Sequence, residues 1–355
     1  MHANPFTCNN KPLLTFKRKT MQSTITKTDA SSARARRTLK DYVGIMLRGV
    51  AMGASDIVPG VSGGTMAFIL GIYEELIDSI RVIGQRDFWR ALLKLQIKEI
   101  LRIVNWPFLV SVALGILIAI ITLSRGLEWL LINQPVLLWS FFFGLVLASV
   151  FTVSKRIPRW NARLLLALLL GAVGAYLLVG AVPTQTPETW WFLVLSGAVA
   201  ICAMILPGIS GAFILVLLGK YQYVLSAVNQ RDFLTLALVA GGAVIGLVSF
   251  AQVLGWLFKR YHDVTVAVLT GLMLGSLRKV WPWKLDVEWL RDSAGQFVLS
   301  HGEPIVIQQR NMLPDLGGSA DLTQLALAVG LALVGFGAIL LLEQLANRQE
   351  KAHGA

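Results

Sequence analysis

Long apolar stretches alternate with short polar ones along this chain of 355 residues. A helix crosses the hydrocarbon core of a bilayer with about 20 mostly apolar residues. Six stretches reach or approach that length without a charged residue, so the pattern predicts an all-α polytopic membrane protein with six spanning helices. These stretches are Trp106–Leu123, Pro135–Val153, Leu164–Val182, Leu234–Phe258, Val264–Leu277 and Leu325–Leu342.

Two further apolar segments are interrupted by proline and small residues. The first contains VPGVSGGT (Val58–Thr65), and the second, 148 residues later, contains LPGISG (Leu206–Gly211). Proline ends a helix, and the backbone groups that it frees cannot face lipid unpaired. We therefore expect two re-entrant helical hairpins, over residues 49–80 and 189–219, whose tips are buried in protein.

The two interrupted segments belong to an internal repeat. VPGVSGGTMAFILGIY (Val58–Tyr73) aligns without gaps with LPGISGAFILVLLGKY (Leu206–Tyr221), and the string QRDF follows in both copies. Each copy, residues 38–182 and residues 189–345, holds one hairpin and three spans. Because three is odd, the second copy enters the membrane upside down, which is the inverted repeat of many secondary transporters. Four further residues recur at a constant offset of 127, namely Gly115, Trp129, Gly144 and Ser149 with Gly242, Trp256, Gly271 and Ser276.

The chain has a net charge of +12, and its basic residues stand in the segments between the spans. With the N-terminus in the cytoplasm, 24 of the 32 Lys and Arg residues fall on the cytoplasmic side, as the positive-inside rule requires. We therefore expect a protein of the cytoplasmic membrane with both termini in the cytoplasm and no nucleic-acid partner. A rival topology, in which the first interrupted segment spans, puts the six basic residues between 81 and 102 outside. The second segment, Thr189–Leu218, is long enough to span, and there the repeat favours the hairpin.

The ends of the chain are expected as tails. Residues 1–37 are polar, basic and rich in Ser and Thr, which predicts disorder. They lack the apolar core of a signal peptide, and Met21 is an alternative start. Residues 346–355 form the C-terminal tail.

Two polar segments between spans receive simple interpretations. A basic residue stands at every fourth position from Arg86 to Arg102, which predicts an amphipathic helix on the cytoplasmic interface over residues 85–104. Anchoring to anionic headgroups is the simpler role for this helix, and substrate capture is the alternative. Residues 278–321 are expected as an external loop.

The two interruptions favour binding of an anion. A helix that restarts after Pro-Gly presents unpaired N–H groups and the positive end of its dipole, which suit phosphate. Glycine permits close approach, and hydroxyls add donors. The alternatives are that the motif only shapes a hairpin tip, and that the arginine of QRDF only pairs with its neighbouring aspartate. The candidate phosphate-binding residues are Gly60, Ser62, Gly63, Gly64, Thr65, Gly208, Ser210 and Gly211, with Arg86 and Arg231 at the two mouths and Pro59 and Pro207 at the helix breaks.

Asp56 is a candidate for coupling transport to protons. It precedes the first motif, and Met204 stands at the matching position of the second copy. An ionisable group inside the membrane is costly and marks function by default. A carboxylate beside an anion site repels the anion unless the carboxylate is protonated. Arg48 or Arg86 could form an ion pair with Asp56. The alternative is that Asp56 caps the helix after the break. Glu74, at the hairpin exit, is a second coupling candidate.

The string GASDIVPGVSGGTMAFILGIYEELI (Gly53–Ile77) resembles the signature of the bacterial and archaeal polyprenyl-phosphate transporter family PopT. The resemblance covers roughly residues 40–345. It implies a flippase that returns undecaprenyl phosphate from the outer to the inner leaflet for recycling in cell-envelope glycan synthesis. It carries the family's motif positions over to Asp56, Pro59, Gly60, Ser62, Gly63, Gly64, Thr65, Glu74, Pro207, Gly208, Ser210 and Gly211.

Three other function classes stay open. A secondary transporter of a small soluble anion shares the broken helices but needs no lateral opening to lipid. A membrane enzyme such as a lipid phosphatase needs a nucleophile and a base, and His262 and His301 stand apart from any Ser or Arg cluster. A structural scaffold tolerates loss of Asp56. The two cysteines and four scattered histidines predict neither a metal site nor a cofactor. Oligomeric state is left open.

Overall fold

The computed structural model describes residues 37–57, 62–184, 186–289, 291, 295–297, 299–300, 303–304, 306–315 and 319–353. Residues 1–36, most of the expected N-terminal tail, lie outside the described residues, as do Pro59 and Gly60 of the first motif. The chain divides into two compact units, residues 1–42 and residues 43–355. The description below concerns the second unit.

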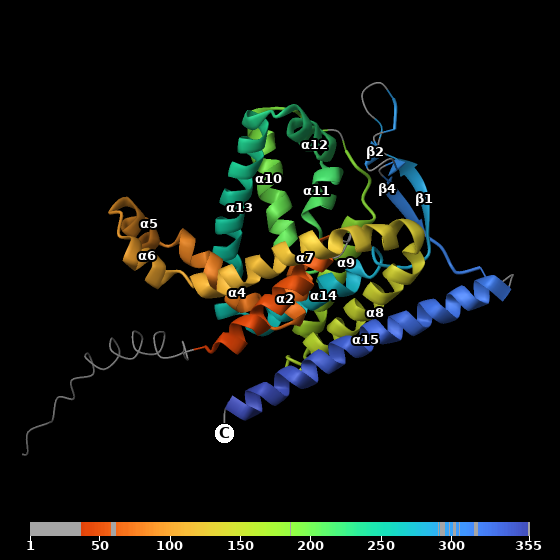
Figure 1. Ribbon diagram of the computed structural model, residues 1–355, viewed down its shortest axis with the longest axis horizontal. Helices are drawn as coiled ribbons and strands as arrows, with labels where there is room; N and C mark the ends of the chain where they lie inside the picture. The colour runs from red at the N-terminus through yellow and green to blue at the C-terminus, as the bar shows by residue number, and fades with distance from the viewer. Residues whose placement is uncertain are drawn as a thin grey trace, which may run out of the picture. The chain divides into compact units, whose positions relative to one another are not determined.

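Most of the described chain is helical (Figure 1). The first half contains α2 (Leu39–Ile57), α3 (Gly63–Ile69), α4 (Tyr73–Arg81), the 3₁₀ turn η1 (Val82–Gly84), α5 (Arg86–Leu93), α6 (Ile97–Ile103), α7 (Trp106–Asn133), α8 (Pro135–Ser154) and α9 (Ala162–Val179). The second half contains α10 (Trp190–Ile205), α11 (Gly211–Leu217), α12 (Tyr221–Gln230), α13 (Phe233–Arg260), α14 (His262–Ser276) and α15 (Ser319–His353).

The order of helices repeats along the chain. α7 and α13 each contain 28 residues and start at Trp106 and Phe233, the offset of 127 that the sequence repeat has. α8 and α14 follow them at Pro135 and His262, again 127 apart. Upstream, short α3 and short α11 follow α2 and α10 at equivalent positions. The aligned sequence blocks therefore form matching helices, although α5 and α6 of the first copy have no counterpart in the second.

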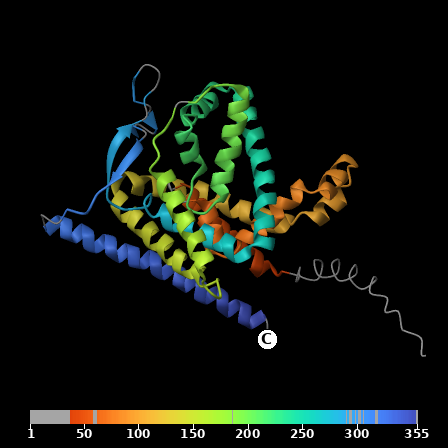
Figure 2. The same ribbon diagram turned by 180° about the vertical axis from the view of Figure 1, so that it is seen from behind.

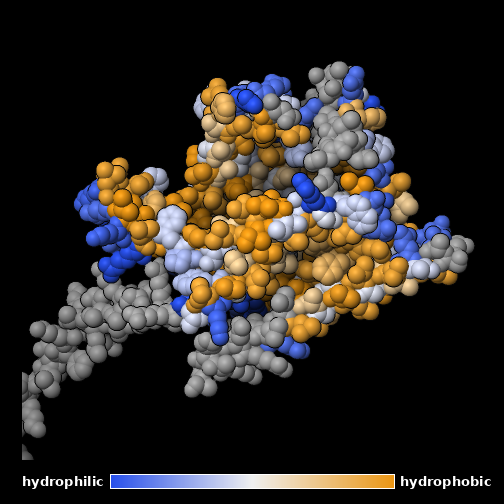
Figure 3. All heavy atoms as spheres, in the orientation of Figure 1, coloured by the Kyte–Doolittle hydropathy of each residue, from blue (hydrophilic) through white to orange (hydrophobic). Residues whose placement is uncertain are grey.

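The prediction of a mostly helical, polytopic membrane protein is confirmed. Among the described residues, five helices are long and apolar enough to cross a bilayer: α7, α8, α9, α13 and the part of α15 from Asp321 to Leu341. The sixth expected span forms α14, which has only 15 residues. The broken pair α11 and α12 also has suitable length and composition, and it bends by 109° at its break. Apolar side chains cover much of the face over α7 and α8, whereas hydrophilic ones gather on α5 and α6 (Figure 3).

Two expectations about the polar segments are corrected. The interfacial helix over 85–104 is divided into α5 and α6, because the backbone turns at Leu95, whose φ is 51°. The segment 278–321 is not only loop. It contains antiparallel strands β1 (Lys284–Trp289) and β4 (Val306–Asn311), and a shorter pair, β2 (Leu299–Ser300) and β3 (Glu303–Pro304). Polar and apolar residues alternate in KLDVEW as in a strand, but Leu285 and Val287 on the apolar face are exposed.

The expected C-terminal tail, residues 346–355, is mostly helical, because α15 continues to His353.

Glycines bring pairs of helices into backbone contact. α10 and α13 run side by side, seen from both sides in Figures 1 and 2. A Cβ atom built on Gly242 of α13 would lie 1.9 Å from the carbonyl oxygen of Val194 in α10. One built on Gly197 of α10 would lie 2.1 Å from that of Val239 in α13. Small residues at such crossings are the usual means of packing helices in membranes, because lipid-facing apolar residues give little drive for association.

We predict that Gly242→Ala lowers the melting temperature of the purified protein in detergent. The added methyl group forces α10 and α13 apart, and overpacking of this kind costs about 1–3 kcal/mol. Gly241→Ala is the matched control, since a Cβ atom at Gly241 meets nothing within 4 Å. Equal melting temperatures for the two variants would contradict the close approach.

Candidate functional site

The two Pro-Gly motifs meet in the structure. The Ser62 hydroxyl donates a hydrogen bond to the carbonyl oxygen of Met204 at 2.9 Å. The backbone N–H of Gly208 donates to the hydroxyl oxygen of Thr65 at 2.8 Å. Both hydroxyl-bearing residues are buried. The structure therefore brings residues 62–65 of the first motif into contact with residues 204–208 at the second motif.

The first motif caps the end of α10. The last carbonyl groups of any helix have no partner within the helix. Two such groups at the end of α10, those of Met204 and Ile205, accept hydrogen bonds from the Ser62 and Tyr73 hydroxyls, the second at 3.1 Å. Gly64 permits this contact, because a Cβ atom there would lie 2.5 Å from the Ile205 oxygen. Ser62 thus bonds the end of α10, and Gly64 leaves room for the close approach.

Asp56 occupies the N-terminal end of α3. Its Oδ1 accepts a hydrogen bond from the Gly63 N–H at 2.6 Å, and the Ser62 hydroxyl accepts one from the Gly64 N–H at 3.1 Å. A Cβ atom at Gly63 would lie 2.4 Å from Asp56 Oδ2, so only glycine leaves room for the carboxylate. The helix start that was expected to hold an external anion therefore holds one from its own chain.

The N-terminal end of α11 differs from that of α3. Ser210 stands at the cap position with φ −101° and ψ 134°, but its side chain makes no capping hydrogen bond. Within the part of the chain that the structure describes, no acceptor is bonded to the N–H groups of Gly211, Ala212 or Phe213. Of the two predicted anion-binding helix ends, the second keeps its donors open.

Pro207 and Gly208 form the turn before α11, and both are buried. Gly208 has φ +92°, a conformation that favours glycine. A Cβ atom there would also lie 2.8 Å from the hydroxyl oxygen of Ser276. The second motif therefore packs against the end of α14.

Three predicted site residues lie elsewhere. Arg86 is exposed at the start of α5, and Arg231 is exposed at the end of α12 with φ 58°. Glu74 is exposed, with Oε1 3.4 Å from Nε2 of His262. No hydrogen bond or ion pair among the described residues joins these side chains to either motif.

The aspartates of the two QRDF strings have local roles. Asp87 Oδ1 lies 3.4 Å from Nη1 of Arg90, so its partner is not Arg86. Asp232 caps α13 by accepting hydrogen bonds from the N–H groups of Leu234 and Thr235. Hydrogen bonds from Thr235 to this carboxylate lower the pKa of Asp232. The repeated string therefore starts a helix in both copies.

Two further residues were missed by sequence reasoning. Tyr73, which caps α10, is signalled by the tyrosine that both repeats share. Lys220 is buried, donates to the carbonyl oxygen of Thr186 at 2.7 Å and lies 5.8 Å from the ring centroid of Phe192. Its signal in the sequence was a single lysine within the otherwise apolar aligned block Leu206–Tyr221. Among the described residues, no group of three His, Cys, Asp or Glu side chains could hold a metal ion.

Comparison with known proteins gives consistent matches. The model of a family described as undecaprenyl phosphate translocase-like matches residues 52–298. The chain is 45% identical over 276 residues to the polyprenyl-phosphate transporter of Vibrio cholerae, covering 77% of this chain and 86% of that protein. It is 31% identical over 257 residues to the polyprenyl-phosphate transporter of Staphylococcus aureus, covering 67% of this chain and 85% of that protein. No solved structure gives a significant match.

We predict that Thr65→Val destabilises the protein. The substitution keeps the shape of the side chain but leaves the buried Gly208 N–H without an acceptor, which costs about 1–3 kcal/mol. Thr270→Val is the matched control, because Thr270 is as buried as Thr65 and its hydroxyl donates only within α14, to the carbonyl oxygen of Val266. Thermal unfolding in detergent should give a lower melting temperature for Thr65→Val than for Thr270→Val. The reverse order would mean that the contact between the motifs contributes little.

Proposed function

We propose that this chain, which belongs to the undecaprenyl phosphate translocase-like family, moves polyprenyl phosphate across the cytoplasmic membrane. It returns undecaprenyl phosphate from the outer to the inner leaflet for recycling in cell-envelope glycan synthesis, as a transporter rather than an enzyme. Its two termini lie in the cytoplasm. The observation that carries the proposal is the direct contact between the two Pro-Gly motifs, through Ser62 and Met204 and through Thr65 and Gly208.

The helix pairs support an inverted repeat. α8 of the first copy packs on α15 of the second, and α14 of the second copy packs on α9 of the first. A Cβ atom on Gly144 would lie 1.9 Å from the carbonyl oxygen of Ala332 in α15. One on Gly271, its counterpart at an offset of 127, would lie 2.1 Å from that of Leu168 in α9. Such an exchange of partners is what a two-fold relation between the copies requires. In this arrangement α2 with α3, and α10 with α11, form re-entrant hairpins from opposite sides.

The phosphate headgroup binds in this proposal at the start of α11, where Gly211 and Ala212 offer N–H groups and Ser210 offers a hydroxyl. The apolar tail stays in lipid along exposed leucines and isoleucines such as Leu117 and Ile121 of α7. A small head bound in protein and a tail left outside fit the chemistry of a lipid phosphate.

Asp56 couples the movement to protons by competing with the phosphate. While Asp56 is ionised, it holds the Gly63 N–H and repels a nearby phosphate. Protonation removes the charge and weakens that hydrogen bond, since charged acceptors bind donors more strongly than neutral ones. The start of α3 then becomes available as a second phosphate position. Glu74, paired with His262 on the surface, is the secondary coupling candidate.

We predict that transfer of undecaprenyl phosphate between leaflets, measured in proteoliposomes, depends on a pH gradient and falls at least about tenfold in Asp56→Asn, which corresponds to about 1.4 kcal/mol or more. Asp78→Asn is the control, because Asp78 is an exposed carboxylate of the same hairpin that lies within 4 Å of Arg81 and Lys259. Gradient-independent transfer in wild type and Asp56→Asn would remove Asp56 as the coupling residue. Absence of lipid transfer together with uptake of inorganic phosphate would favour the soluble-anion transporter instead.

A further inference from the structure

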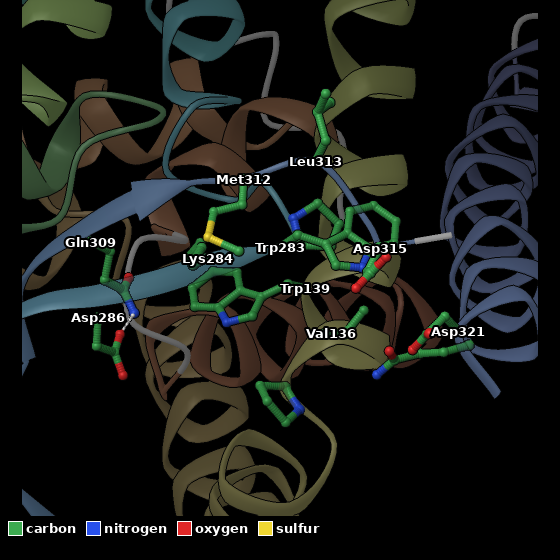
Figure 4. A pocket seen from close by; sticks show the side chains of 13 residues that line it. Val136, Trp139, Trp283, Lys284, Asp286, Gln309, Met312, Leu313, Asp315 and Asp321 are labelled. Atoms are coloured by element: carbon green, nitrogen blue, oxygen red, sulfur yellow. Dashed lines mark hydrogen bonds between the residues drawn. The ribbon is translucent and has the colours of Figure 1, made fainter. Parts of the chain in front are cut away.

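Two lysines lie at the base of the β1–β4 sheet, away from the Pro-Gly motifs. Lys284 opens β1 opposite Asn311 of β4. Its ammonium group lies 3.4 Å from the ring centroid of Trp139 (Figure 4). Its Nζ atom is buried and has no hydrogen-bond partner among the described residues. The ammonium group of Lys279 lies 5.3 Å from the ring centroid of Phe213 in α11.

The positive charge of these lysines is not balanced. Among the described residues, no carboxylate forms an ion pair with Lys279 or Lys284. Burial lowers the pKa of Lys279, and burial together with the charge of Lys279 lowers the pKa of Lys284 well below its usual range. The negative charge of Asp286 raises the pKa of both lysines, but by less than burial lowers it. Asp286 Oδ1 accepts a hydrogen bond from Gln309 at 2.8 Å. Within the described chain, these ammonium groups lie against the aromatic rings of Trp139 and Phe213 and not against a carboxylate, so an anion beside them would lower the cost of burying their charge.

A small void is lined by both lysines. Its volume is about 40 Å³, and the polar residues Arg278, Gln308 and Asn311 are also in its lining. One water molecule needs about 10–15 Å³ of such space, so the void has room for a few waters or one tetrahedral oxyanion.

A larger cavity of about 320 Å³ also has Lys284 in its lining, together with Trp139 (Figure 4). Asp286, Asp315 and Asp321 line this cavity, so it disfavours anions. The void on the Lys279 side is therefore the better place for a phosphate group.

We propose that Lys279 and Lys284 form a binding site for a phosphate monoester on the sheet side of the protein, next to α11. The proposal rests on the proposed function, since it makes this void the first position of the lipid phosphate on the outer side. Phe213 connects the void with the start of α11. Its ring faces the Lys279 ammonium group, and it is the third residue of α11, the helix that starts after the second motif. A headgroup held here lies in a void that Phe213, in the first turn of α11, also lines. The same chemistry would also accept free inorganic phosphate.

Binding to purified full-length protein in detergent tests the site. The ligands are radiolabelled inorganic phosphate and farnesyl phosphate, with farnesol and chloride as the uncharged and non-phosphate comparisons. We predict that Lys279→Met and Lys284→Met each weaken phosphate binding by about tenfold or more, as expected for loss of a charge-assisted hydrogen bond. Arg310→Gln is the matched control, because Arg310 is an exposed basic residue of β4.

The site would be overturned if phosphate binding were unchanged in both lysine variants, or if chloride bound the wild type as tightly as phosphate does. Tighter binding of farnesyl phosphate than of inorganic phosphate identifies the lipid as the ligand, and the reverse order identifies free phosphate. Lipid transfer is measured in parallel on the same preparations. Transfer by wild type with unchanged binding in the lysine variants would defeat this site alone. Lysine-dependent binding without lipid transfer would defeat the proposed function and leave the site standing.

A pH dependence gives a second, independent readout. The pKa of Lys284 is lower in the folded state than the unfolded value of about 10.4, so the folded protein binds fewer protons and its stability rises with pH up to that value. Without phosphate, Lys284→Met should therefore melt above wild type at pH 7, by a margin that shrinks towards pH 10. Saturating phosphate should close the margin at pH 7. A margin that does not change with pH or phosphate would mean that the Lys284 ammonium is not an unpaired buried charge.

Discussion

The need to satisfy backbone hydrogen bonds away from water governs the centre of this protein. Each Pro-Gly interruption frees carbonyl and N–H groups that lipid cannot bond, at a cost of several kcal/mol for each group left unpaired. The structure satisfies several of them across the repeat, since Ser62 and Tyr73 cap α10 and Thr65 accepts from Gly208. Each interruption is therefore stabilised in part by the other, which lies against it.

The two copies of the repeat have diverged at the position that decides what each helix start binds. Asp56 gives the first copy an internal carboxylate, which occupies the Gly63 N–H, whereas the second copy has Met204 at the equivalent place. The start of α11 is left without such an acceptor among the described residues. The described structure therefore has one helix start with an N–H group bonded to an internal carboxyl group and one helix start with open N–H groups.

Much of this could be predicted from the sequence, because its signals are periodic or repeated. The apolar stretches around Trp106–Leu123 and Leu234–Phe258 predicted spans, and the duplicated Pro-Gly strings predicted the helix breaks. Which atom binds which could not be predicted. The contact of Ser62 with Met204 depends on the crossing of helices 142 residues apart, and no pattern encodes it. Lys284 was missed for a similar reason, since KLDVEW is polar enough to indicate an exposed loop until strand pairing places the ammonium over Trp139.

The distribution of contacts indicates which parts can move without the fold being lost. The pairs α8 with α15 and α9 with α14 join the two copies through backbone contacts at glycines such as Gly144 and Gly271, and packed backbones of this kind do not deform gradually. The short helices α3 and α11 are instead linked across the repeat by a few hydrogen bonds, such as that of Thr65 with Gly208. A phosphate oxygen can accept the same bonds that Thr65 and Asp56 accept now. For the proposed transport, we infer that a headgroup passing between α3 and α11 exchanges these partners one at a time, while the helix pairs between the copies stay closed.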